Sequence, residues 1–344
     1  MARFSTDASI QALNEIVISG GGLAGLSLAI GLRRAGVEVV LHEAGEYPRH
    51  RVCGEFISGI STEALERIGI MECLKDARQR FSFSWHRGDQ ALRHGRLPRP
   101  ALAISRYRLD DRLQSLARDL GVDLQASSRL RDRPHEPGFI KASGRIPTRG
   151  PWIGLKAHVR GLKTSAELEM HTGHNGYLGI TEVEDGWFNV CGLFRNDRGL
   201  NARHGDLLIE HVRRNGSHAL ARSLQQASWR EGSFCAVAGF ELGAQNRLPG
   251  VLCLGDSHAI IPPFTGNGMS MAFEAVDLAL PELVSYAFGQ VDWAVAVASI
   301  EKSLANAFHA RLAASRCIHP ALFSSCSRLL FKHLPLKPVL KLIR

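Results

Sequence analysis

The stretch IVISGGGLAGLSLAIGLRRAGVEVVLHEAGEYPRHRVCGE, residues 16–55, decides the fold. Residues 16–19 form a short apolar run that ends in glycine, which predicts a buried strand. From residue 23 to residue 35 the apolar side chains recur at helical spacing and stop before Gly36, a natural C-cap. Residues 37–41 are short and β-branched, which predicts a second strand closed by Glu43. The stretch therefore predicts a complete βαβ unit.

The glycines of this unit have the spacing of a dinucleotide-binding turn, GxGxxG. The first glycine allows a tight turn, the second lets the backbone approach a pyrophosphate, and the third lets the helix pack close to the strand. The pyrophosphate would lie on the helix N-terminus, where free N–H groups favour an anion. A carboxylate at the end of the second strand is placed to accept hydrogen bonds from ribose hydroxyls. The predicted nucleotide contacts are Gly20, Gly22, Leu23, Ala24, Gly25, Glu43 and Ala44.

A second glycine motif favours FAD over NAD as the dinucleotide. Gly255-Asp256 ends a predicted strand, so its carboxylate can accept a hydrogen bond from a ribitol hydroxyl. A Gly-Asn-Gly turn then opens a long predicted helix and can present backbone N–H groups to pyrophosphate or to the carbonyl edge of a flavin. The predicted contacts from this motif are Asp256, Pro263, Gly266, Asn267, Gly268 and Met269.

Composition narrows the class of protein. The chain has 344 residues and a formal net charge of +9, but its basic residues carry no helix-turn-helix, zinc-finger or RNP-like pattern, so no nucleic-acid partner is predicted. Its 7 cysteines form no CxxC pair, which indicates reduced thiols and a cytoplasmic location. The first residues lack the apolar region of a signal peptide, and no apolar run is long enough to span a membrane. Residues 322–344 mix apolar and basic side chains, and this tail is a candidate for peripheral membrane contact.

Residues 15–285 carry, in this order, GGGLAG, Glu43, RVCGE, SRYRLD and GDSHAIIPPFTGNGMSMAFEA. With these motifs the chain resembles the FAD-dependent oxidoreductases of the para-hydroxybenzoate hydroxylase fold. More narrowly, the chain resembles the branch that includes geranylgeranyl reductases. The resemblance implies an α/β fold: a Rossmann-like, glutathione-reductase type FAD-binding domain with an interleaved β-sheet substrate domain and C-terminal helices. We expect the FAD-binding domain at 1–80, 100–150 and 245–290, the substrate domain at 81–99 and 151–244, and the helical region at 291–344.

The resemblance also implies roles for single residues. Arg51 and Arg106 would reach the FAD, and Asp256 would hold its ribitol. Cys53, Gly54 and Glu55 would lie beside the flavin ring and the substrate, which makes Cys53 and Glu55 candidate catalytic residues. Cys53 can equally be a small wall of the flavin pocket, because a thiol needs a lowered pKa to act as a nucleophile. NAD(P)H is expected as a transient electron donor without a domain of its own.

The sequence departs from the family pattern at its middle motif. Residues 141–145 read KASGR where the fold usually has Gly-Ala-Asp-Gly, so Ser143 and Arg145 are only secondary candidates for cofactor contact. His158 is interpreted as a sheet histidine, and His171 and His174 lack a third ligand at a recognisable spacing, so no metal site is predicted.

Three functions stay open from the sequence. The first is a monooxygenase that hydroxylates a hydrophobic or aromatic small molecule with NAD(P)H. The second is a reductase of alkene bonds in isoprenoid or lipid-like substrates, and the third is a flavoprotein scaffold without turnover. No residue in the sequence decides between oxygen chemistry and alkene reduction, and the oligomeric state stays open.

Overall fold

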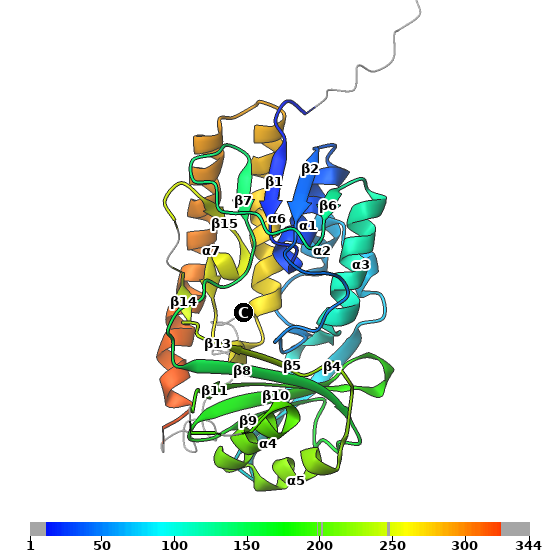
Figure 1. Cartoon of the computed structure of the whole chain (residues 1–344), viewed down its shortest axis with the longest axis vertical. Helices are drawn as coiled ribbons and strands as arrows, with labels where there is room; N and C mark the ends of the chain where they lie inside the picture. The colour runs from blue at the N-terminus through cyan, green and yellow to red at the C-terminus, as the bar shows by residue number, and fades with distance from the viewer. Residues whose placement is uncertain (1–11, 198, 201, 246–247, 325–344) are drawn as a thin grey trace, which may run out of the picture.

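A computed structural model of the chain describes residues 12–197, 199–200, 202–245 and 248–324. Two sheets lie at opposite ends of an elongated molecule, with helices flanking the first sheet and two helices beyond the second (Figure 1). No helix in these ranges is long and apolar enough to cross a membrane. The tail considered above for membrane contact begins inside the described residues, but its residues 325–344 lie outside them.

The first sheet is parallel throughout. Its strand order is β15 (Leu252–Cys253), β7 (Phe139–Lys141), β1 (Ile16–Ser19), β2 (Val39–His42) and β6 (Asp123–Gln125). One large apolar core joins this sheet to the helices α1 (Leu23–Arg34), α2 (Thr62–Ile68), α3 (Arg106–Asp119), α6 (Gly268–Ala287) and α7 (Trp293–Ala321). Because the strands are parallel, their carboxyl ends meet at one edge of the sheet, where open α/β folds bind their ligands.

The second sheet has nine strands and is mostly antiparallel. Its order is β12 (Ser228–Trp229), β8 (Trp152–Arg160), β11 (Phe188–Arg195), β10 (Gly176–Glu182), β9 (Leu168–Thr172), β4 (Arg78–Arg87), β5 (Gln90–Ala103) and β3 (Phe56–Ile57), and β13 (Cys235–Ala238) also pairs with β8. A separate apolar cluster packs its outer face against α4 (His204–Arg214) and α5 (His218–Gln226). A short pair, β14 (Gly243–Ala244) and β16 (Ala259–Ile260), completes the strands of the described residues.

The predicted βαβ unit is present as β1, α1 and β2, and Ser61 caps α2 as its sequence position indicates, with its hydroxyl accepting a hydrogen bond from the Ala64 N–H at 3.2 Å. The Pro, Gly and Arg content of residues 131–151 predicts an irregular crossover, and the short strand β7 lies within this stretch. Residues 204–226, inside the expected substrate domain, form the helices α4 and α5. The limits of the two domains stay a prediction.

Candidate cofactor and active site

The turn between β1 and α1 explains each glycine of the first motif. Gly20 has a φ of +114°, and a Cβ there would lie 2.4 Å from the Ala142 carbonyl oxygen. A Cβ on Gly25 would lie 1.9 Å from the Gly20 carbonyl oxygen, so the helix can approach the strand only without a side chain. A Cβ on Gly22 would meet no atom within 4 Å. Gly20 and Gly25 therefore shape the turn, whereas Gly22 keeps open the space in front of the helix N-terminus.

Glu43 lies at the end of β2, as predicted, and is buried. Its carboxylate accepts hydrogen bonds from the backbone N–H groups of Gly21 at 2.8 Å and Gly45 at 3.0 Å, and it pairs with the guanidinium groups of Arg49 and Arg51. Burial alone would raise the pKa of Glu43, but the two arginines and the backbone donors outweigh it and lower the pKa. The residue is therefore a fixed anionic acceptor at the edge of the sheet, and Ala44 beside it is exposed.

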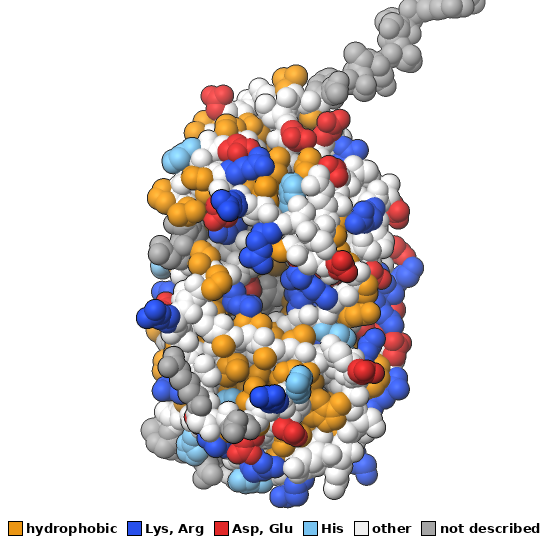
Figure 2. Space-filling model, viewed as in Figure 1, with side chains coloured by type: hydrophobic (Ala, Val, Ile, Leu, Met, Phe, Trp, Pro, Cys, Tyr) orange, Lys and Arg blue, Asp and Glu red, His pale blue; other side chains and the backbone are white. Residues whose placement is uncertain are grey.

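Arg51 and Arg106, both predicted to reach the cofactor, converge on Asp110 of α3. Arg51 Nε lies 3.0 Å from one carboxylate oxygen of Asp110, and Arg106 binds both oxygens at 2.7 and 2.8 Å. Asp110 is fully buried, so two cations are positioned by one anion between the two sheets. Figure 2 shows that this face of the molecule is hollowed between its two halves, with Lys and Arg side chains around the hollow.

The second glycine motif also fits a bound group. Gly266 has a φ of +68°, and a Cβ on Gly268 would meet no atom within 4 Å. Asn267 is fully buried, yet neither amide atom has a hydrogen-bond partner among the described residues. A buried, unpaired amide costs free energy unless a ligand satisfies it, so this turn fits the polar edge of FAD. Asp256 is exposed beyond the carboxyl end of β15, and it interacts electrostatically with Arg106 and Arg145.

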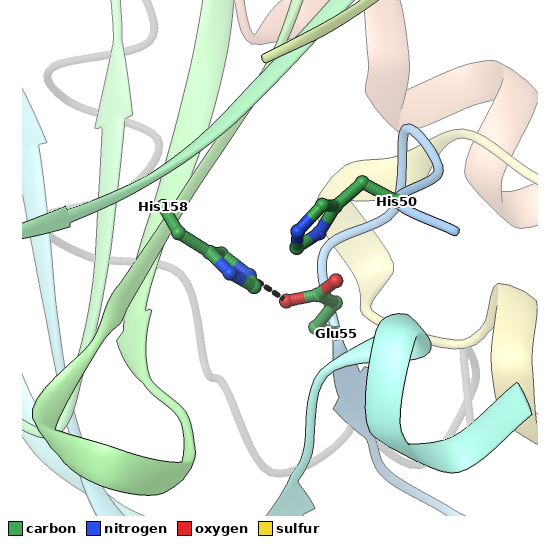
Figure 3. A group of neighbouring side chains, drawn as sticks. All are labelled: His50, Glu55 and His158. Carbon is green, nitrogen blue, oxygen red and sulfur yellow. Dashed lines mark hydrogen bonds and ion pairs between the residues drawn. The ribbon is translucent and has the colours of Figure 1, made fainter. Parts of the chain in front are cut away.

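Three wholly buried charged or polar side chains meet where the loop after β2 reaches the second sheet. Glu55 lies on this loop, and Lys156 and His158 lie on β8. His158 Nε2 is 2.6 Å from one oxygen of Glu55, as Figure 3 shows, and Lys156 Nζ is 3.2 Å from the other. Burial opposes the charge on Glu55, but Lys156 and His158 outweigh it and lower the pKa of Glu55. We name these three residues the Glu55 group.

His50 joins the Glu55 group from the same loop and connects it to the surface. Its Nδ1 lies 3.0 Å from Lys156 Nζ, and its ring is stacked on Tyr107 and edge-on to His158. Burial, and then the charge of Lys156, lower the pKa of His50 to about 3. The imidazole is therefore neutral at pH 7 and accepts the hydrogen bond of the ammonium. His50, Glu55 and His158 could ligate a metal by their spacing, but the Lys156 ammonium takes the place of the cation.

The loop carrying Cys53 is tied to the same sheet face. Asn189 lies opposite His158 on β11, and its amide donates to the Cys53 carbonyl at 3.0 Å. Burial raises the pKa of the Cys53 thiol above its usual range. A raised pKa leaves less of the thiolate that a nucleophile needs, which favours Cys53 as a wall of the site.

This assignment predicts that Cys53 resists alkylation in the folded protein. Brief treatment with iodoacetamide at neutral pH, followed by peptide mass spectrometry, should label Cys317 and leave Cys53 unlabelled. Cys317 is exposed and serves as the internal control. Labelling of Cys53 at the rate of Cys317 would show an accessible thiolate and reopen a nucleophilic role.

In the structure Arg51 contacts Glu43, Arg51 and Arg106 share Asp110, and the Arg106 N–H donates to Glu55. The sequence predicted the two glycine turns, Glu43, Arg51, Arg106, Cys53 and Glu55 as site residues, and their roles stay a prediction. It missed Asp110 and Lys156, and it interpreted His158 as structural. The signal for β8 was present: Lys156 and His158 are two residues apart in WIGLKAHVR, so both point to one face of an otherwise apolar strand.

Comparison with known proteins finds relatives for part of the chain. Residues 14–151 match the family of FAD binding domains. A menaquinone reductase of Mycolicibacterium smegmatis is 30% identical over 142 residues, which is 38% of this chain and 32% of that protein. A dialkyldecalin synthase of Streptomyces rugosporus is 30% identical over 133 residues, which is 38% of this chain and 28% of that protein. The chain thus spans about a third of the length of these relatives.

Solved structures extend the likeness to the whole fold. A flavin-dependent brominase covers 96% of this chain and 93% of its own, with a TM-score of 0.76 and 16% identity. A p-nitrophenol 4-monooxygenase from Pseudomonas putida covers 96% and 97%, with a TM-score of 0.76 and 14% identity. These structures confirm the predicted α/β fold, and the family match over residues 14–151 confirms the predicted FAD as the cofactor.

Proposed function

We propose that this chain is an FAD-dependent monooxygenase that hydroxylates a hydrophobic or aromatic small molecule, with NAD(P)H as its electron donor. The observation that carries the proposal is the Glu55 group, which lies between the cofactor loops and the second sheet. A buried carboxylate held by an ammonium and an imidazole beside the cofactor loops is a candidate for a functional site. The loop from Glu43 to Glu55 ties this group directly to the nucleotide-binding edge.

The cofactor loops would hold FAD by its anionic and polar parts. The N-termini of α1 and α6 present free N–H groups beside the open spaces at Gly22 and Gly268, and Glu43 would accept from the ribose. Asn267 would give its unpaired amide to the flavin edge. When bound, FAD supplies the exchange of hydride and electrons with the nicotinamide, oxygen or substrate.

The Glu55 group would manage protons during turnover. Lys156 Nζ holds a proton between Glu55 and His50, and the half-buried His50 offers an acceptor nitrogen on the route to solvent. His158 Nε2 and Glu55 share a second, short hydrogen bond, which fixes the carboxylate. Hydroxylation of an aromatic ring requires that a proton leave the substrate, and a buried chain of donors and acceptors provides for this step.

The same face of the second sheet supports an apolar substrate. Beyond Lys156 and His158 it carries Tyr177 and Leu193, which pack with Phe264 of the second cofactor motif in one apolar cluster. The Tyr177 and Phe264 rings meet edge to face with centroids 6.0 Å apart. This face therefore carries an apolar cluster beside the Glu55 group, an arrangement that would suit a hydrophobic molecule with one polar group.

Alkene reduction is a second candidate, because it needs a proton donor across the double bond from the hydride and Lys156 holds such a proton in a site without bulk water. The menaquinone reductase named above adds weight to this candidate.

The visible spectrum and one kinetic experiment test the proposal. The purified full chain should be yellow or become so with added FAD; a colourless protein would favour the scaffold without turnover. The reduced protein is then mixed with oxygen in a stopped-flow instrument, with and without 4-nitrophenol as a probe phenol. A monooxygenase should show a transient absorbance that belongs to neither the reduced nor the oxidised cofactor.

A direct return to the oxidised spectrum would contradict the monooxygenase. Anaerobic mixing of the reduced protein with a prenylated quinone then tests the second candidate, since reoxidation there without oxygen requires electron transfer to the quinone.

A further inference from the structure

The outer face of the second sheet carries a group of three side chains that the oxidoreductase site does not use. We propose that His86, Glu169 and His171 form a binding site for a divalent transition metal ion such as Zn²⁺. Strands β4 and β9 are parallel neighbours, and their register sets His86 opposite His171 and Ser84 opposite Glu169. Because side chains two residues apart on a strand share a face, Glu169 and His171 project beside His86.

The ligand atoms of the three side chains already converge. One carboxylate oxygen of Glu169 is 3.0 Å from His171 Nε2, and the other is 3.8 Å from His86 Nε2. All the candidate ligand atoms lie within 4.8 Å of one another. Two imidazoles and one carboxylate are a common ligand set for zinc, with bonds of about 2.0–2.2 Å and a fourth position left for another group. The ligand atoms are therefore close enough to surround an ion after a local change of ring orientation.

The carboxylate is oriented by its own partners. Ser165 donates its hydroxyl to a Glu169 oxygen at 2.7 Å, and its backbone N–H donates to the same oxygen. Such outer contacts orient a metal ligand and increase the affinity of the site for the metal. The other oxygen of Glu169 faces His171, where an ion would replace the present hydrogen bond.

One ring must turn for the ion to enter. The His86 and His171 rings are stacked with centroids 4.4 Å apart and planes at 13°, whereas a metal lies in the plane of each imidazole that binds it. His86 is the more exposed of the two. Its Nε2 lies 3.0 Å from the Ser84 hydroxyl and 3.3 Å from the Ser165 hydroxyl, and both of these partners are neutral. Rotation of His86 about its Cβ–Cγ bond would exchange two weak contacts for a metal bond.

A fourth ligand is available from the next strand. His94 lies opposite Ser84 on β5, is exposed, and has its ring 6.2 Å from the ring of His86. Three adjacent strands thus place three imidazoles and one carboxylate on one patch. The sequence predicted no metal because His171 and His174 lack a third ligand nearby in the chain. The sheet register supplies one from β4, which lies about 80 residues earlier in the sequence.

The contrast with the Glu55 group supports this choice. There the carboxylate and the imidazoles surround the Lys156 ammonium, so a metal would meet a fixed positive charge. At Glu169 both ion pairs found are with imidazoles, which can lose a proton and bind a cation. The outer site lies on the face that packs against α4 and α5, so it would act apart from the flavin, as a link between β4 and β9.

The test uses the full-length, FAD-loaded protein without an affinity tag, freed of metal by a chelator and titrated with Zn²⁺ in a calorimeter. One equivalent should bind. Loss of an outer-shell contact alone costs about 10–100-fold in metal affinity, so His171→Ala and Glu169→Gln should each weaken binding by at least about 100-fold. His174→Ala is the matched control, because His174 belongs to the same HTGH segment, is exposed and lies outside the group.

A further variant keeps the result interpretable if a buried substitution disturbs folding. His86→Asn changes the most exposed of the three proposed ligands. The flavin absorbance and circular dichroism of this variant should equal those of the native protein while Zn²⁺ binding is lost. Absence of a stoichiometric binding event in the native protein would overturn the proposal. Equal affinity in the native protein, His86→Asn and His171→Ala would also overturn it, because the ion would then be held elsewhere, as by the cysteines.

Discussion

Gly22→Val is expected to yield a folded protein that retains no FAD. The backbone at Gly22 has a φ of −84°, which any residue can adopt, and the space where the new side chain would lie holds no protein atom within 4 Å. The valine should therefore cost little stability in the apoprotein. It would, however, fill the approach of the pyrophosphate to the N-terminus of α1. The measurement is the ratio of flavin to protein absorbance after gel filtration with excess FAD.

Gly25→Val is the matched comparison for this prediction. A Cβ there would lie 1.9 Å from a backbone oxygen of the same turn, so the substitution should destabilise the fold itself. The urea midpoint of the apoprotein should fall clearly for Gly25→Val and hardly at all for Gly22→Val. Stoichiometric FAD in Gly22→Val would show that the pyrophosphate does not pass this turn.

Lys156→Met is expected to destabilise the protein by about 3–5 kcal/mol, because it leaves the Glu55 carboxylate buried without its ammonium partner. Both side chains are wholly buried and 3.2 Å apart, so solvent does not screen the pair. The single variant Glu55→Gln should show a similar loss, since it leaves the ammonium unpaired. Urea unfolding of the FAD-free proteins at neutral pH measures both.

The double variant Glu55→Gln with Lys156→Met separates stability from function. A neutral pair of similar volume should regain most of the lost stability, because no uncompensated charge remains. It should not regain turnover, since the proton held at Lys156 Nζ is gone. Recovery of turnover in the double variant would mean that the Glu55 group is structural. Equal stability of Lys156→Met and the native protein would mean that the pair is solvated in solution.

The parts of the fold that could be predicted from sequence are those where local chemistry and global structure agree. Gly20, Gly22 and Gly25 follow an apolar strand and open a helix. Gly20 and Gly25 lie too close to backbone atoms for a side chain, and Gly22 leaves space in front of the helix N-terminus. Glu43 follows from the same unit, because the end of β2 must lie beside that turn. The GNG turn at Gly266 could be predicted for the same reason.

The parts that could not be predicted depend on register between distant strands. Lys156, His158 and Glu55 meet only because β8 faces the loop after β2, and no local spacing indicates this. Asp110 becomes the common partner of Arg51 and Arg106 through the placement of α3. The helices α4 and α5 show apolar periodicity, with Leu208, Val212 and Leu224 buried, but strands on both sides masked that signal.

The order of strands in the first sheet has a consequence for how the chain is made. β1 pairs with β7, and β7 pairs with β15 at residues 252–253, so the parallel sheet is completed only after the whole second sheet has been synthesised. A ribosome-bound chain that ends before β15 must keep the edge of β7 unpaired while the nine-stranded sheet forms. Such late, long-range pairing folds slowly and exposes apolar surface meanwhile. The newborn protein should therefore depend on chaperones until the strand that precedes Asp256 emerges.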